Sequence, residues 1–184
     1  MAATDFFKVE VWTFRGLVTY YVLFFMRLET RSVHIAGVTT APNSAFMQQM
    51  ARNLTDVEDG FLLNSRYLIM DRDTKYTDAF RGLLDREGVK PVRCPARAPN
   101  CNAFAERFVR SIKDECLDRM ILFGEASLRR ALREYDLHYH TERNHQGVGN
   151  RLLKPVDRDS STNDPIHCRE RLGGLLNFYY REAA

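Results

Sequence analysis

The sequence predicts an α/β fold built on a five-stranded mixed sheet with helices on both faces. Three runs rich in Val, Phe, Tyr and Ile lie close together at the start of the chain, and only short turns separate them, which favours antiparallel strands. Farther along, segments with helical spacing alternate with short apolar runs, which favours parallel strands joined by right-handed crossovers. With 184 residues, 45% of them hydrophobic, the chain is long enough for one packed domain.

Each predicted element has a local reason. The strands are rich in β-branched and aromatic residues, and the helices carry apolar residues three and four positions apart. Asn43 or Ser44 can cap the first helix, Gly88 ends the second, and two prolines make 95–100 a loop. In chain order we expect strands at 5–12, 17–27 and 32–39, a helix at 45–54, a strand at 67–70, a helix at 78–87, a strand at 89–94, and helices at about 102–117 and 125–140.

The chain divides into a folded core over 1–155 and a C-terminal linker and apolar tail over 156–184. Residues 157–164 are polar and without periodicity, which is typical of a linker or an exposed loop. Residues 172–180 are apolar, so we expect this tail to dock on its own domain or on a partner subunit.

Composition favours an intracellular protein without a membrane segment. The longest apolar run, 17–26, is far shorter than the roughly 18 to 20 residues that a membrane span needs, and the N-terminus has no signal-peptide pattern. The four cysteines form no CxxC pair and no zinc-type spacing, so we expect free thiols in a reducing cytosol. They are Cys94, Cys101, Cys116 and Cys168.

Three acidic residues are the strongest functional signal. Asp5 opens the first apolar run, Asp71 ends the run at 67–70, and Glu106 lies one turn into a predicted helix. Carboxylates gathered at strand ends repel one another and are costly to desolvate, so a cluster of them is best explained by divalent cations. We therefore expect a metal-dependent active site, in which Asp5 and Asp71 share a metal and Glu106 completes a site for two cations.

A basic segment lies beside these acids. Although the whole chain carries a formal charge of only +3, residues 93–113 contain five basic residues and one acid. Arg110 and Lys113 follow Glu106 at i+4 and i+7 on the same predicted helix face, where they could bind DNA phosphates. Asn102 could cap that helix or contact DNA, and capping is the favoured interpretation.

Other residues have alternative interpretations. Asp73 could compete as a ligand, but the turn that follows it favours an exposed position. His138, His140 and His145 could suggest a metal site, but no recognised ligand spacing is complete, so we expect a polar helix end. Aromatic residues of the first two strands could stack on bases but are more often core. We assign to the core Phe6, Phe7, Trp12, Phe14, Tyr20, Tyr21, Phe24 and Phe25.

The three acids lie in segments that resemble the three acidic motifs of the integrase catalytic core, which is found in DDE transposases of bacterial insertion sequences and in retroviral integrases. The motif segments are 4–7 (TDFF), 68–76 (LIMDRDTKY) and 99–107 (PNCNAFAER). The resemblance continues through 113–119, 139–145 and 172–175, and the separation of Asp71 from Glu106 is close to the gap typical of the family.

This resemblance implies a ribonuclease H-like fold, two Mg²⁺ or Mn²⁺ ions, and Asp5, Asp71 and Glu106 as their ligands. The implied reaction is nicking at a transposon end, followed by attack of the freed 3′-hydroxyl on target DNA. The implied partners are double-stranded DNA and at least one further copy of the chain, in the bacterial cytoplasm at the nucleoid. Departures from the family pattern are Asp73, where glycine is common, and Asn144, where proline is usual.

Two other functions remain open. A structure-selective nuclease or ribonuclease H of the same fold would cut without strand transfer. A decayed or domesticated transposase fragment would bind DNA or a partner without reacting. The presence of all three acids counts against loss of chemistry, whereas the expected absence of a helix-turn-helix region for recognising transposon ends counts against autonomous transposition.

Overall fold

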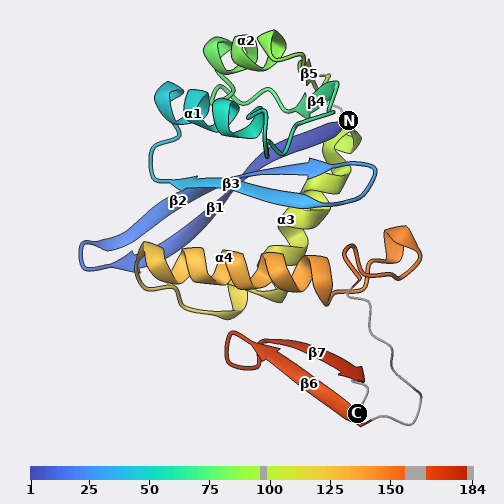
Figure 1. The fold of residues 1–184 in the computed structure, drawn as a ribbon. Coiled ribbons are helices and arrows are strands. Elements are labelled where there is room, and N and C mark those ends of the chain that lie inside the picture. Colours follow the sequence, from blue (N-terminus) through green and yellow to red (C-terminus); the bar gives the residue numbers. More distant parts are fainter. Residues whose placement is uncertain (96–98, 156–164, 182–184) are drawn as a thin grey trace. The chain divides into compact units, whose positions relative to one another are not determined.

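A computed structural model of the protein describes residues 1–95, 99–155 and 165–181, and the chain forms two compact units (Figure 1). The first unit is Met1–Arg110 and the second is Ser111–Ala184, so the division falls within helix α3 (Ala103–Glu115). The predicted linker at 157–164 lies outside the described residues, and the predicted core boundary at 155 stays a prediction.

The first unit contains the predicted five-stranded mixed sheet, in the order β3-β2-β1-β4-β5. The pairs β1–β2 and β2–β3 are antiparallel, whereas β4 is parallel to both β1 and β5. This arrangement confirms the predicted fold class and places the first strand at the centre of the sheet. The strands are β1 (Ala2–Thr13), β2 (Gly16–Arg27), β3 (Val33–Thr39), β4 (Tyr67–Met70) and β5 (Lys90–Arg93).

Helices cover both faces of this sheet, because the strands are apolar on both sides. On one face Leu23 and Phe25 belong to a core cluster with buried residues of α1 and α2. On the other face the ring of Phe24 lies 6.0 Å from that of Phe7 and 4.8 Å from that of Phe108 on α3. Residues 23, 24 and 25 therefore alternate between the two layers, as side chains of a strand do.

The helices agree with the sequence prediction in number and order. Asn43 is confirmed as the α1 cap, because its side chain accepts a hydrogen bond of 3.0 Å from the Phe46 amide. In the described part of the chain, no helix is both long and apolar enough to cross a membrane. The helices are α1 (Ser44–Leu54), α2 (Asp78–Arg86), α3 (Ala103–Glu115) and α4 (Gly124–Thr141), with 3₁₀ turns η1 (Pro99–Asn102), η2 (Leu117–Arg119) and η3 (Gln146–Val148).

The hairpin of β1 and β2 extends beyond β3, because β3 pairs only with residues 21–26 of β2 (Figure 1). Phe7, Phe24 and other aromatic residues near its base are buried, as expected. At its tip, however, Trp12 is 51% exposed and Phe14 is fully exposed. Assigning these two residues to the core was therefore wrong, since they lie where the hairpin has no covering layer within its own unit.

The C-terminal tail forms a second hairpin, which the sequence pattern did not predict. Strands β6 (Ile166–Arg171) and β7 (Leu176–Arg181) are antiparallel, and Leu172, Gly173 and Gly174 between them all have positive φ. Two adjacent glycines make this turn possible, because they adopt positive φ at little steric cost.

This second hairpin is attached to α4 mainly by charge. The Glu142 side chain, which is 1% exposed, accepts hydrogen bonds of 2.8 and 2.7 Å from the Arg171 guanidinium. His138 Nδ1 lies 3.1 Å from the same carboxylate, and Glu134 binds Arg171 at 2.9 Å. Burial disfavours the charge on Glu142, but the Arg171 and His138 contacts outweigh it and hold the pKa of Glu142 below its ordinary value. Within the second unit, the tail therefore docks through ion pairs more than through its apolar residues.

Replacing Arg171 by Ala should release the β6–β7 hairpin, because it leaves the buried Glu142 carboxylate without its main partner. Loss of such a pair costs about 3 kcal/mol, so amide exchange in the hairpin should quicken by about 100-fold. Arg169→Ala is the matched control, since Arg169 is 42% exposed and lies 3.4 Å from Glu142. Equal exchange in the two variants would contradict this attachment.

The lowered pKa of Glu142 gives a second test. As pH falls through this pKa, protection of the wild-type hairpin amides from exchange should decline as well.

Candidate metal centre

Asp5 lies in β1, and Asp71 directly follows β4, the parallel neighbour of β1 in the sheet. In the parallel β1–β4 pair, Ala2 is opposite Leu68 and Ala3 is opposite Ile69. The pairing ends there, and Asp5 and Asp71 each lie two residues farther along the chain, Asp71 directly after β4. By alternation Asp5 shares the face of Ala3. Asp5 is also opposite Phe24 of β2, whose ring contacts Phe108 on α3, so Asp5 belongs to the α3 face.

Local hydrogen bonds fix both aspartates. Asp5 Oδ1 accepts a bond of 2.7 Å from the Phe6 amide, and Asp71 Oδ1 accepts one of 3.0 Å from the Asp73 amide. The second bond forms an Asx turn that ends β4 and redirects the chain. Among the described residues, neither aspartate has a hydrogen bond through its second oxygen.

Glu106 comes from the helix that covers this face. It lies in the first turn of α3 and is exposed, whereas Ala105 and Phe108 on either side of it are buried. Just before the helix, Asn102 donates a hydrogen bond of 3.0 Å from Nδ2 to the backbone oxygen of Thr4, next to Asp5. Asn102 is only 7% exposed, and its Oδ1 has no hydrogen-bond partner in the part of the chain that the structure describes. The favoured prediction that Asn102 caps α3 was therefore wrong, because its side chain binds the sheet instead of the helix amides. Contact of Asn102 with DNA stays a prediction.

The charges of these acids interact. Burial raises the pKa of Asp5 to about 6, the Phe6 amide partly opposes this shift, and the charges of Asp71, Glu106 and Asp73 raise the pKa further. The predicted acids therefore share one region of negative potential. Within residues 1–95, 99–155 and 165–181, no three His, Cys, Asp or Glu side chains are grouped closely enough to hold a metal ion. The role of the acids as metal ligands accordingly stays a prediction.

Asp73 has a partner of its own. Lys75 binds it twice, through the backbone amide at 2.9 Å and through Nζ at 2.6 Å. Burial alone would raise the pKa of Asp73, but these Lys75 contacts lower it overall. Asp73 is thus only partly exposed, less than the predicted turn suggested, and its charge is paired with Lys75. The spacing Asp-Thr-Lys was a signal for this pair that the sequence prediction missed.

The three histidines are structural. His138 contacts Glu142, His140 Nδ1 lies 2.8 Å from the Asp136 backbone oxygen, and His145 Nε2 lies 2.7 Å from that of Tyr139. His138 and His140 lie in the last turn of α4, which agrees with the expected polar helix end, and all three side chains are buried there by their local contacts. Burial also lowers the pKa of His145, which favours its neutral form.

Arg110 and Lys113, the two α3 residues predicted to contact DNA, differ in exposure and in the unit to which they belong. Arg110 is exposed one turn after Glu106 and belongs to the first unit. Lys113 is partly buried and belongs to the second unit, so it is not part of the site formed by the first unit. Contact of either residue with DNA stays a prediction.

All four cysteines are free thiols, as expected.

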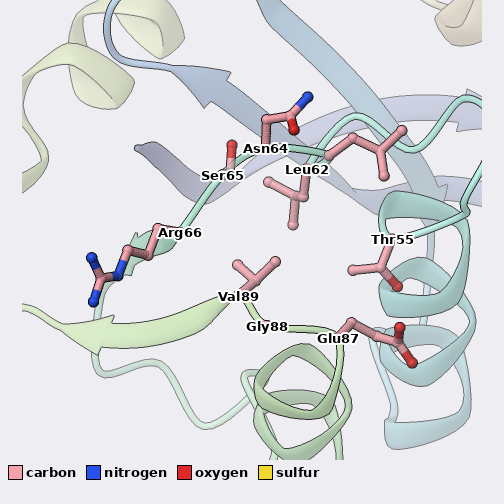
Figure 2. A pocket seen from close by; sticks show the side chains of 9 residues that line it. Thr55, Leu62, Asn64, Ser65, Arg66, Glu87, Gly88 and Val89 are labelled. Carbon is pink, nitrogen blue, oxygen red and sulfur yellow. The ribbon is translucent and has the colours of Figure 1, made fainter.

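A pocket in the first unit lies away from the acids. It is lined by the ends of α1 and α2 and by the residues that precede β4 and β5, among them Thr55, Ser65 and Glu87 (Figure 2). Asp71 follows the opposite end of β4. The pocket is therefore not part of the carboxylate site.

Comparisons with known proteins agree with this arrangement. Residues 87–152 match the family described as "Integrase core domain", a segment that contains Glu106 but neither aspartate. No curated protein matches the chain. Among solved structures, the catalytic core domain of BIV integrase matches with a TM-score of 0.54 and 14% identity, over 83% of this chain and 89% of that one.

The fold and these matches define an α/β chain with the ribonuclease H-like fold of integrase cores. The resemblance predicted from the three acidic motifs is thereby confirmed for the family segment at 87–152 and for the fold. At 14% identity, the likeness to BIV integrase supports the fold alone.

The raised pKa of Asp5 predicts how stability changes with pH in a chelating buffer. Folded Asp5 binds its proton more tightly than unfolded Asp5, so the free energy of unfolding should fall as pH rises from about 4 to about 6. Asp5→Asn should remove this decline and stabilise the protein at pH 7 by up to about 3 kcal/mol. Denaturant titrations across this range measure the effect, and Asp59→Asn, at an exposed loop carboxylate, is the control. An identical pH slope in Asp5→Asn would contradict the assignment.

Proposed function

We propose that this chain is the catalytic core of a DDE transposase or integrase, which nicks DNA and then joins a DNA end to a target by metal-dependent phosphoryl transfer. The observation that supports the proposal is the proximity of the three acids: Asp5 lies in β1, Asp71 directly follows the neighbouring parallel strand β4, and the charges of Asp71 and Glu106 both act on Asp5. A binding domain without chemistry has no need to place like charges together at this cost.

The donor set fits a hard divalent cation. Carboxylate oxygens are the ligands that Mg²⁺ and Mn²⁺ prefer, and Asp5, Asp71 and Glu106 supply only such oxygens. Asp5, Asp71 and Glu106 would hold two ions in the active complex. When bound, such ions supply the positive charge that activates an attacking oxygen and stabilises the leaving oxygen.

The remaining residues of the site would position DNA. Arg110 is exposed one helical turn beyond Glu106, where its guanidinium can bind a backbone phosphate, and Lys113 continues the same helix face by sequence. In the first step water displaces a 3′-oxygen at the end of the element. In the second step the freed 3′-hydroxyl attacks a phosphodiester of the target and releases another 3′-hydroxyl, so the number of phosphodiester bonds is conserved.

The partners follow from this reaction. The proposed substrates are double-stranded element ends and target DNA, and the proposed setting is the bacterial cytoplasm at the nucleoid. Joining two ends in one event requires at least two active sites, so we propose a homodimer or larger assembly. The proposed catalytic core extends over 1–155, with 156–184 as linker and tail.

Asp71→Asn should abolish the reaction, because it removes a carboxylate from the pair that would hold the ion. The assay incubates supercoiled plasmid and a labelled double-stranded oligonucleotide end with Mn²⁺, and it scores nicked plasmid and joined product separately. We expect both products from the wild type and a loss of about 1,000-fold or more in the variant. Asp59→Asn should react normally. Nicking without joining would favour a ribonuclease H-like nuclease, and DNA binding without either product would favour an inactive fragment.

Arg110→Ala should weaken binding to DNA of any sequence and reduce the slope of log K against log salt by about 1, as expected for one lost phosphate contact. Mn²⁺ affinity should not change, because Arg110 carries no oxygen donor. Fluorescence anisotropy with labelled duplex at several salt concentrations gives the slope. The control is Arg133→Ala, which removes an equal charge from an exposed position on α4. The proposed contact is wrong if both variants bind DNA alike.

A further inference from the structure

The link between Asn102 and Thr4 joins two segments that are 98 residues apart in the sequence. Thr4 is fully buried, and its Oγ1 donates a hydrogen bond of 2.8 Å to the backbone oxygen of Phe24 in β2. The β1–β4 ladder ends at Ala3, and the Thr4 carbonyl beyond it accepts the Asn102 amide. Asn102 therefore binds a rigid point of the sheet, one residue before Asp5.

Of the two polar atoms of the Asn102 side chain, Nδ2 has a hydrogen-bond partner and Oδ1, which is buried, has none in the described residues. A buried acceptor without a partner costs free energy, so the amide is not the side chain that stability by itself would favour at this position. An aspartate of the same shape would lose the donor and add a fourth negative charge near Asp5, Asp71 and Glu106.

A second contact holds the same end of the helix. The Arg31 guanidinium, in the turn between β2 and β3, lies 3.4 Å from the ring centroid of Phe104 in the first turn of α3. Asn102 and Phe104 thus both attach the start of α3 to the first unit, four and two residues before Glu106.

We propose that Asn102 is a positioning residue, whose amide bond to the Thr4 carbonyl fixes Glu106 relative to Asp5 and thereby sets the affinity for the divalent cation. This inference rests on the proposed function, because it assumes that the acids bind the ion. In this proposal Asn102 is not itself a ligand of the ion. Its effect passes through the helix, which distinguishes it from a ligand.

The test measures Mn²⁺ binding to the full chain by calorimetry, together with the melting temperature in chelator. Asn102→Ala should raise the dissociation constant for Mn²⁺ by about 10-fold or more, as for other residues that orient metal ligands. Asn43→Ala is the matched control, because it also removes one asparagine hydrogen bond at a helix start, that of α1 to Phe46. Asn43→Ala should lower the melting temperature while leaving the Mn²⁺ affinity unchanged.

Two further variants keep the test decisive. Asn102→Ser retains a short donor and should fold with intermediate affinity, so it replaces Asn102→Ala if that variant does not fold. Asn102→Asp should bind Mn²⁺ less tightly than wild type, although the added charge would strengthen binding if residue 102 were a ligand. Wild-type Mn²⁺ affinity in a destabilised Asn102→Ala or Asn102→Ser variant would overturn the positioning role alone. A wild-type chain without Mn²⁺ affinity would instead overturn the proposed function, and the inference with it.

Discussion

The parallel pairing of β1 with β4 is the constraint on which the carboxylate site depends. β1 is held at the centre of the sheet by its long antiparallel pairing with β2, and its parallel pairing with β4 ends two residues before Asp5 and Asp71. A slip of one residue would turn one aspartate to the opposite face of the sheet. The apolar residues on both faces of β1 and β2 oppose such a slip, because each would move into the wrong layer. Core packing and the placement of the acids are therefore specified together.

The proximity of several acids costs electrostatic free energy. The surrounding residues reduce this cost but do not remove it. Asp73, the nearest additional acid in the chain, is neutralised by Lys75, and Glu106 remains exposed to solvent. Asp5 has no such compensation, and its raised pKa is the remaining cost. The start of α3 is nevertheless attached firmly to the sheet through Asn102 and Phe104. The structure thus combines fixed supports at the start of α3 with a negative region around Asp5.

Local pattern predicted most of the fold, because strand composition, helix spacing and caps such as Asn43 are encoded by neighbouring residues. The central place of the first strand and the helices on both faces followed from connection rules. Features that depend on distant partners were missed. The Asn102–Thr4 bond joins residues far apart in sequence, and the tail hairpin depends on Arg171 meeting Glu142, neither of which leaves a local signal. Trp12 and Phe14 were misassigned because strand propensity does not reveal whether another layer covers a strand.

The exposed tip of the first hairpin has a practical consequence for spectroscopy. Trp12 is the single tryptophan of the chain, and it is half exposed, away from the buried residues of the main core cluster. Intrinsic tryptophan emission should therefore start near the wavelength typical of a hydrated indole. A blue shift or quenching on addition of another macromolecule would report contact at the hairpin tip, whereas opening of the α1–α2 core layer could pass almost unnoticed in this signal.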